Sequence, residues 1–206
     1  MNDITQQFHE IPTTCISDAM QGLNNLHSSI KPLKAEYKIA GRALTVKMPV
    51  GDNLSVLNAI REARPGDILV IDAKGDTYRA IAGDFVVEMA QALGIQGMVV
   101  DGVIRDIMGI KQLNFPVFCK GTTVAASNKA GVGEINVPIS CGGASIQPHD
   151  IIVGDADGVV VIPQTVEQDI LNKSLKKMEN DQKRADSVLQ NKERIMQYLD
   201  NMLQGS

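Results

Sequence analysis

The chain has 206 residues, 44% of them hydrophobic and 21% charged, which is ordinary for one globular domain with a sizeable core. Its net charge of −4 and its aromatic content of 3%, without Trp, argue against binding of nucleic acid or of an anionic membrane surface. No apolar run reaches the length of a membrane span, about 18 residues. The three widely spaced cysteines favour a reducing, cytoplasmic setting.

Hydrophobic spacing and turn residues predict helices and strands that alternate along most of the chain. In chain order, we expect a helix over residues 11–23, a strand over 41–49, a helix over 51–63, strands and helices in turn over 67–72, 85–93, 97–101 and 107–113, and strands over 116–119 and 158–163. Asp52 or Asn53 is the expected N-cap of the second helix, and Gly94 ends the third. The alternation places the chain in the α/β class.

Two short segments of the sequence resemble each other. PGDILV (residues 65–70) and PHDIIV (residues 148–153) both consist of a turn followed by an apolar strand. Two copies of six residues do not make a repeat protein. They predict paired strands in related parts of one sheet or barrel.

The character of the sequence changes at residue 165, so we divide the chain into a domain over residues 1–164 and a helical extension over residues 165–206. Thr165 and Gln168 fit a capping box, and the residues that follow predict one long helix. Between residues 179 and 187 only Ala185 is apolar, which is typical of a helix that leaves its own domain. The apolar side chains between residues 188 and 199 then need a partner, and we expect them to pack on a neighbouring subunit.

The most informative segment runs from Gly83 to Asp106, where a predicted helix, a buried strand and a tight turn follow one another. Asp84 lies at the start of the helix, where a carboxylate either caps the helix or remains available for chemistry. The N–H groups of residues 84–87 would point at one spot. Such a helix N-terminus is a ready site for a carboxylate of a ligand.

Arg105 and Asp106 directly follow the buried strand. A planar guanidinium suits the carboxylate of a 2-oxo acid or an enolate oxygen, and a carboxylate is a hard ligand for Mg²⁺ or Mn²⁺. From local sequence alone, Arg105 is also consistent with a surface residue, and Asp106 with the cap of the next short helix.

An Asp followed after 20 residues by Arg-Asp, as formed by Asp84, Arg105 and Asp106, resembles the pattern of metal-dependent pyruvate aldolases. The segments GIQGMVVDGVIRD (94–106) and GDADGVVVIP (154–163) resemble core signatures of the same family. From about residue 13 to residue 163, the chain is similar to the 4-hydroxy-4-methyl-2-oxoglutarate aldolase / RraA-like family.

This resemblance implies a fold and an assembly. The fold would be a swivelling β/β/α-type domain with a central β-barrel flanked by helices, followed by the long C-terminal helix. The assembly would be a homotrimer or a dimer of trimers, with active sites at the subunit interfaces.

The resemblance also implies roles for single residues. Asp106 would bind the divalent metal cation, Asp84 would hold a metal-bound water, and Arg105 would bind the substrate and stabilise a pyruvate enolate. A Glu from the C-terminal helix of a neighbouring subunit would complete the site; Glu179 matches best, and Glu193 is its rival. The carboxylate of pyruvate would be bound by the backbone of Gly83, Asp84, Phe85 and Val86.

The implied activity is that of a lyase. It would cleave 4-hydroxy-4-methyl-2-oxoglutarate-type 2-oxo acids to pyruvate by a retro-aldol reaction, and it would decarboxylate oxaloacetate through the same enolate. A metal acting as a Lewis acid, with Arg105 beside it, would stabilise that enolate. The motif supplies no Lys for a Schiff base, so we expect the class II, metal-dependent route.

Two other functions compete with this one. RraA proteins resemble the chain as well and inhibit a ribonuclease by protein contact. They typically lack the acid at the position of Asp84 and carry one at the position of Gly109, so both positions favour the enzyme. A methyltransferase is disfavoured because the sequence has no glycine-rich nucleotide loop followed by an acid at a strand end.

Overall fold

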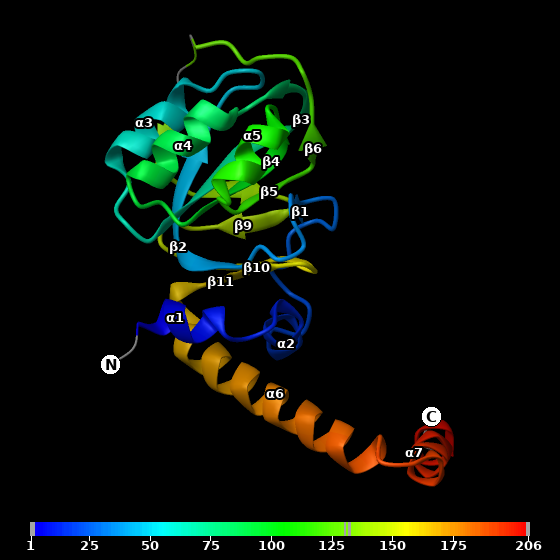
Figure 1. Cartoon of the computed structure of the whole chain (residues 1–206). Helices are drawn as coiled ribbons and strands as arrows, with labels where there is room; N and C mark the ends of the chain where they lie inside the picture. Colours follow the sequence, from blue (N-terminus) through cyan, green and yellow to red (C-terminus); the bar gives the residue numbers. More distant parts are fainter. Residues whose placement is uncertain (1–2, 130, 132, 205–206) are drawn as a thin grey trace.

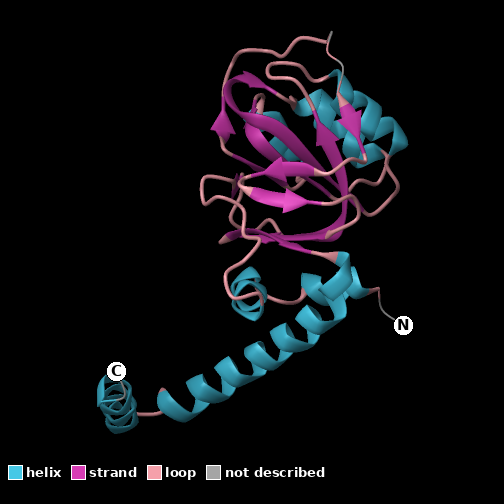
Figure 2. Ribbon diagram, turned by 180° about the vertical axis from the view of Figure 1, so that it is seen from behind, coloured by secondary structure: helices cyan, strands magenta, loops and turns pink. Residues whose placement is uncertain are grey.

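The computed structural model describes residues 3–129, 131 and 133–204 (Figures 1 and 2). A curled mixed sheet forms the centre of the body, helices pack on its outside, and a helical extension leads away from it. The strands of the main sheet are β1 (Lys31–Pro32), β2 (Ile39–Lys47), β3 (Asp67–Ala80), β4 (Gly97–Ile104), β5 (Val117–Cys119), β6 (Gly121–Thr122), β7 (Glu134–Ile135), β10 (Ile151–Asp155) and β11 (Gly158–Ile162).

The main sheet closes almost completely on itself. Its strand order is β1-β5-β4-β3-β2-β10-β11, with β6 paired to β4 and β7 paired to β2. The two ends of this path meet, because the Lys31 ammonium donates a hydrogen bond of 2.6 Å to the carbonyl of Asp157, in the turn between β10 and β11. A separate hairpin of β8 (Ile139–Cys141) and β9 (Ala144–Ile146) packs its apolar side chains into the barrel interior. The α/β fold with a central barrel is therefore confirmed.

Strands β2, β3, β4 and β5 run parallel, so their carboxyl ends lie at one edge of the sheet. Both faces of these strands are buried. In β3, Ile68 and Val70 point into the barrel, whereas Leu69 and Ile71 pack against the outer helices. Strands buried on both faces read as continuous apolar runs, which is why the sequence predicts them well. The sequence underestimates the lengths of β3, which continues to Ala80 through irregular pairing with β4, and of β4, which continues to Ile104.

Two groups of helices cover the barrel. The helices α3 (Leu54–Glu62), α4 (Asp84–Ala92) and α5 (Ile107–Leu113) pack on β2, β3 and β4. The helices α1 (Ile4–His9), α2 (Thr13–Ala19) and the start of α6 (Glu167–Val188) cover β10 and β11. Helix α2 is shorter than the expected 11–23, because Gln21 and Gly22 have φ angles of 58° and 76° and turn the chain away.

The two similar segments, 65–70 and 148–153, lie on either side of β2, which pairs in parallel with β3 and antiparallel with β10. Their turns are built alike. Gly66 and His149 have φ angles of 96° and 69°. The carboxylates of Asp67 and Asp150 each accept a 2.8 Å hydrogen bond from the N–H three residues earlier. The predicted location of both strands in one sheet is confirmed, but they do not pair with each other, because β2 lies between them.

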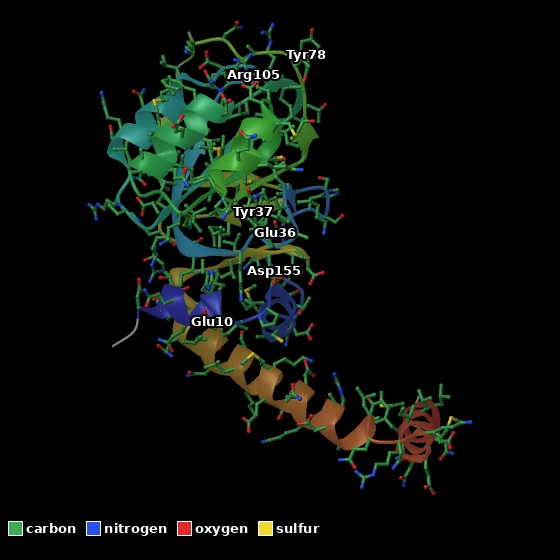
Figure 3. All side chains as sticks on the ribbon, in the orientation of Figure 1. Glu10, Glu36, Tyr37, Tyr78, Arg105 and Asp155 are labelled. Carbon is green, nitrogen blue, oxygen red and sulfur yellow. The ribbon has the colours of Figure 1, made fainter. Side chains whose placement is uncertain are left out.

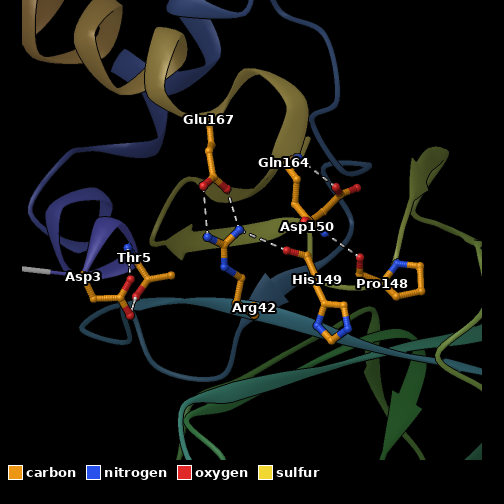
Figure 4. Close-up of polar contacts among 8 residues, drawn as sticks. All are labelled: Asp3, Thr5, Arg42, Pro148, His149, Asp150, Gln164 and Glu167. Carbon is orange, nitrogen blue, oxygen red and sulfur yellow. Dashed lines mark hydrogen bonds and ion pairs between the residues drawn. The ribbon is translucent and has the colours of Figure 1, made fainter.

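An ion pair fixes the start of α6 to the barrel (Figure 4). The Arg42 guanidinium donates to both carboxylate oxygens of Glu167, at 2.5 and 3.1 Å, and to the carbonyl of His149 at 3.2 Å. The hydrogen bond from Arg42 to Glu167 raises the pKa of Arg42. Helix α6 therefore leaves the body from a defined position and direction.

The C-terminal extension differs from its prediction in two ways. The capping box is wrong: a short 3-10 helix, η1 (Gln164–Val166), precedes α6, and the N-cap Val166 has no side-chain hydrogen bond to offer. The long helix ends at Val188, and a second helix, α7 (Lys192–Gln204), follows after a break. Ile170 and Leu171 pack on the body as α6 begins, while Leu175 is 40% exposed. Farther along, Met196 and Leu199 of α7 are also exposed.

None of the described helices is long and apolar enough to cross a membrane. The cysteines Cys15, Cys119 and Cys141 are all buried and free. Burial raises the pKa of each of the three thiols, and the effect is largest for Cys141. A buried neutral thiol behaves as a small apolar side chain, which agrees with a packing role for all three.

Candidate functional site

A cavity of about 270 Å³ lies at the edge of the sheet where β3 and β4 end and α4 begins. We call it the strand-end cavity. In α/β sheets, the carboxyl ends of parallel strands are the usual location of binding sites. The cavity is lined by every residue that the Asp-Arg-Asp pattern singled out: Gly83, Asp84, Phe85, Val86, Arg105 and Asp106.

Backbone pairing brings the two halves of this pattern together. The N–H of Ile81 donates to the carbonyl of Val103 at 2.9 Å, and the N–H of Arg105 donates to the carbonyl of Ala82 at 3.0 Å. Gly83 consequently lies against the side chains of Arg105 and Asp106. A Cβ at Gly83 would lie 2.3 Å from Asp106 Oδ2 and 3.4 Å from Arg105 Nε. Only glycine permits this approach, so the motif is held as one unit.

Asp106 is in a conformation that frees its side chain. It is the N-cap of α5 with φ 57° and ψ 39°, in the left-handed region, and its carboxylate makes no capping hydrogen bond. This excludes the capping role that the local sequence allowed. Its Oδ2 atom lies 3.3 Å from Arg105 Nε, and both side chains are about two-fifths exposed, at 43% and 42%. Non-glycine residues with such backbone angles are uncommon and cluster at functional sites.

The N-terminus of α4 offers fewer free N–H groups than the sequence suggests. Gly83, not Asp84, is the N-cap. The Asp84 carboxylate accepts a 2.7 Å hydrogen bond from the N–H of Phe85, and the N–H of Val87 donates to the carbonyl of Gly83 at 3.1 Å. Among the described residues, no partner accepts from the N–H groups of Asp84 and Val86. These two groups remain available to a carboxylate.

Asp84 is in close contact with α5. A Cβ at Gly109 would lie 2.5 Å from Asp84 Oδ2 and 2.9 Å from Asp84 Cβ. Asp84 therefore keeps its present position only when residue 109 has no side chain. A side chain at position 109 would therefore displace the carboxylate of Asp84 from the place it has here.

The sequence analysis missed three polar residues that line the cavity, namely Asn53, Ser127 and Lys129. Asn53 was expected only as a helix cap, but its side chain makes no capping bond, and the carboxylate of Asp52 accepts from the N–H of Leu54 instead. Lys129 lies in a loop without strong periodicity, so no local signal distinguishes it. Its presence also means that the cavity does contain a lysine, although the motif supplies none.

The structure does not bring Glu179 or Glu193 to the strand-end cavity of their own chain. Glu179 lies on the exposed side of α6, where the ammonium of Lys183 donates to it and lowers its pKa. Glu193 is exposed in the first turn of α7. Figure 3 shows Arg105 at the end of the body that lies far from α6 and α7. A role for either Glu therefore requires a second subunit.

The residues at the cavity suit a hard divalent cation. Within residues 3–129, 131 and 133–204, no cluster of three or more His, Cys, Asp or Glu side chains could hold a metal. Mg²⁺ is commonly held by one or two carboxylates, with waters and substrate oxygens completing its shell. Asp106 offers one such carboxylate without a competing cap, and Asp84 borders the same cavity. This donor set fits Mg²⁺ or Mn²⁺ and does not fit a softer metal.

Comparison with known proteins agrees with this geometry. A family model named RraA-like, described as Aldolase/RraA, matches residues 13–161. The chain belongs to the RraA-like family. A relative from Halalkalibacterium halodurans named "Putative 4-hydroxy-4-methyl-2-oxoglutarate aldolase" is 58% identical over 204 residues, which are 99% of this chain and 97% of that protein.

Solved structures with the same fold have other descriptions. A Streptomyces coelicolor protein, described as an unusual member of the RNase ES inhibitor RraA family, matches with a TM-score of 0.77 and 26% identity, over 88% of this chain and 95% of the other. A Geobacillus kaustophilus protein described as S-adenosylmethionine: 2-dimethylmenaquinone methyltransferase matches with a TM-score of 0.69 and 30% identity, over 74% and 95%. The family is thus established, and the site must decide the activity.

Proposed function

We propose that this RraA-like protein is a divalent-metal-dependent lyase that cleaves 4-hydroxy-4-methyl-2-oxoglutarate-type 2-oxo acids to pyruvate. The observation that carries the proposal is the meeting of Asp84, Arg105 and Asp106 at one cavity beside a helix N-terminus. The name of the 58% identical relative supports the same reaction class. We also expect decarboxylation of oxaloacetate, because both reactions pass through the enolate of pyruvate.

The substrate would be held at its 2-oxo acid end. Its C1 carboxylate accepts from the N–H groups of Asp84 and Val86 at the positive end of α4. The guanidinium of Arg105 lies next to the 2-oxo oxygen and stabilises the charge that develops there. A permanently charged, planar donor suits this task better than a neutral one, because its interaction with the 2-oxo oxygen becomes stronger as negative charge develops there in the enolate.

Asp106 would hold the metal, with Mg²⁺ or Mn²⁺ as the ion that suits an oxygen ligand. Such an ion supplies Lewis acidity at the 2-oxo oxygen. In the cleavage itself, a water held by the Asp84 carboxylate takes the proton of the C4 hydroxyl. The C3–C4 bond breaks, C4 becomes a carbonyl, and the electron pair forms the enolate that Arg105 stabilises. Protonation at C3 then releases pyruvate.

Lys129 introduces a competing mechanism, since a lysine could form a Schiff base with the 2-oxo group. Schiff-base lysines are normally activated by burial among apolar groups, whereas Lys129 is exposed. We therefore keep the metal-dependent route. Treatment with borohydride in the presence of pyruvate should label no lysine; labelling of Lys129 would overturn this choice.

The second candidate function is inhibition of a ribonuclease by protein contact, which the likeness to the Streptomyces coelicolor inhibitor-family protein favours. The contact between Asp84 and Gly109 argues against the inhibitor role. RraA-type inhibitors typically carry an acid at the position of Gly109 and none at the position of Asp84. Co-purification with a ribonuclease, combined with absence of lyase activity, would favour the inhibitor.

We further propose that residues 165–206 pack on a neighbouring subunit in a homotrimer or a dimer of trimers. Helix α7 contacts α6 and leaves the side chains of Met196 and Leu199 exposed, and a neighbouring subunit would cover this apolar surface. Glu179 or Glu193 would then approach the cavity of the neighbour. The buried, unpaired thiols favour the cytoplasm as the setting.

The deciding experiment measures pyruvate release from 4-hydroxy-4-methyl-2-oxoglutarate and from oxaloacetate, with Mg²⁺ or with EDTA. Wild-type activity should require the metal, and Arg105→Ala should reduce kcat/KM by about 1,000-fold, as expected for loss of a charged donor to a developing oxyanion. Arg61→Ala, which removes an exposed arginine of α3 outside the strand-end cavity, should retain full activity. No turnover by the wild type with any divalent metal would reject the lyase.

A further inference from the structure

One wall of the strand-end cavity comes from a loop that contains none of the predicted site residues. Lys129 lies in the loop after β6, it is exposed, and it borders the cavity. No described residue forms an ion pair or a hydrogen bond with its ammonium group. An exposed cation at the mouth of a polar cavity is available to an anionic ligand.

The backbone that carries Lys129 is fixed on both sides. The N–H of Asn128 donates to the carbonyl of Gly51 at 2.8 Å, and the N–H of Asn53 donates to the carbonyl of Asn128 at 3.0 Å. One residue earlier, the Ser127 hydroxyl donates to the carbonyl of Ala80 at 2.7 Å. The loop is thus attached to the end of β3 and to the start of α3. Because the loop is already held in place, binding of a ligand to it costs less conformational entropy.

The same wall contains a buried acceptor without a donor. Asn53 is 7% exposed, and its Nδ2 donates to the carbonyl of Ile81 at 3.0 Å. Its Oδ1 is buried and has no hydrogen-bond partner among the described residues. Buried acceptors are almost always paired in folded proteins. A ligand that brings a hydroxyl donor to this wall would satisfy Asn53.

The charges at the cavity favour an anionic ligand. The charged residues that line it are two carboxylates, Asp84 and Asp106, and two cations, Arg105 and Lys129, so they carry no net charge together. A divalent cation would make the site positive, even with a Glu from a neighbouring subunit beside it.

We propose that Lys129 and Asn53 form a second binding subsite, which recognises the C4 end of the substrate and selects dicarboxylic 2-oxo acids. Lys129 binds the carboxylate attached to C4. In the bound substrate, before cleavage, Asn53 Oδ1 accepts from the C4 hydroxyl, and the proton passes to the water held by Asp84 when the reaction begins. The inference rests on the proposed lyase function and names its specificity residues. When the C3–C4 bond breaks, the carboxylate bound to Lys129 leaves with the new carbonyl compound, and its charge is unchanged throughout.

The test of Lys129 uses binding, so it does not depend on turnover. Dissociation constants are measured by calorimetry in Mg²⁺ for 2-oxoglutarate and for 2-oxopentanoate, which have the same chain length but differ in the distal carboxylate. Wild type should bind the diacid about tenfold more tightly, as expected for one charge-assisted hydrogen bond. Lys129→Met should abolish this preference and leave the affinity for the monoacid unchanged. Lys38→Met, at the opposite edge of the parallel strands, should behave as wild type.

The outcomes separate this inference from the function on which it rests. Equal affinity of wild type for both acids, or equal weakening of both by Lys129→Met, overturns the subsite while leaving the lyase intact. Failure of wild type to bind either acid overturns the subsite and rejects the lyase with it.

The role of Asn53 is tested by comparing two reactions of one variant. Asn53→Ala should raise KM for 4-hydroxy-4-methyl-2-oxoglutarate about tenfold, because the C4 hydroxyl of the bound substrate loses an acceptor. Oxaloacetate has no C4 hydroxyl, so its decarboxylation should change less than twofold. A similar effect on both reactions would mean that Asn53 is only structural and would remove it from the subsite.

Discussion

The barrel with its strand-end cavity and the extension formed by α6 and α7 are stabilised in different ways. In the barrel, β3 is buried on both faces, and the cavity residues are fixed by backbone pairing and by close glycine contacts. In the extension, only the first turns of α6 pack on the body, and much of the remaining surface carries ion pairs between neighbouring turns. The comparison shows that long-range packing holds the cavity residues in place, whereas most of the extension is held by contacts between neighbouring turns of its own helix.

The largest stability effect should come from the barrel. Ile71→Ala removes a fully buried side chain between β2 and β4 and should lower the free energy of unfolding by about 3–4 kcal/mol. Leu175→Ala in α6, where the side chain is 40% exposed, should lower it by less than about 1 kcal/mol. Urea unfolding of both variants checks the contrast, and equal losses would contradict the division between the two regions.

Within the barrel, glycine substitutions should separate function from stability. Gly83→Ala places a Cβ 2.3 Å from Asp106 Oδ2 and should reduce lyase activity about 100-fold, because it displaces the site by a fraction of an ångström or more. Gly143→Ala meets no atom within 4 Å but has φ +82°, so it should destabilise the protein by about 1 kcal/mol and leave activity unchanged. Steady-state kinetics and thermal unfolding of both variants give the two readouts.

The joint between the two regions is the Arg42–Glu167 pair, whose side chains are 31% and 23% exposed. Arg42→Met should lower the free energy of unfolding by about 1 kcal/mol, because a bidentate ion pair that is partly screened by solvent contributes little more than this. Glu167→Gln and the double variant complete a thermodynamic cycle in urea. A coupling energy near zero would mean that apolar packing by Ile170 and Leu171 alone attaches α6.

The smallest effect concerns pH and the extension alone. Hydrogen bonds from Lys183 and Lys177 lower the pKa values of Glu179 and Asp181 below their ordinary values of 4.5 and 3.8. Because the folded-state values are the lower ones, the contribution to stability is present above the ordinary values and is lost as pH falls through the lowered ones.

Hydrogen exchange should therefore show α6 losing protection below about pH 4 while the barrel strands keep theirs. Lys183→Met should remove the part of this response that depends on Glu179. A barrel that loses protection at the same pH as α6 would contradict the assignment of the effect to the extension.

Sequence patterns predicted the strands best where burial is two-sided, as in β3 and β4, because continuous apolar runs are a local signal. They failed at the start of α6, where Thr165 and Gln168 fit a capping box but η1 takes up those positions. Capping of α6 depends on where the chain leaves the preceding strand β11, and the tertiary structure determines that position. The break between α6 and α7 was also missed, although Asn191 caps α7 by accepting a hydrogen bond of 3.0 Å from the N–H of Arg194.

The sequence by itself determined the α/β class and the spacing of Asp84, Arg105 and Asp106, because strand burial and residue spacing are local properties of the chain, and its resemblance to the RraA-like family implied the barrel. Only the tertiary structure decided which other residues lie beside these three side chains. Loop pairing brings Asn53 and Lys129 to the same cavity from segments more than 70 residues apart. Contact with α5 requires glycine at position 109, and the left-handed backbone of Asp106 frees its carboxylate. These features depend on long-range packing, which leaves no periodic trace in the sequence.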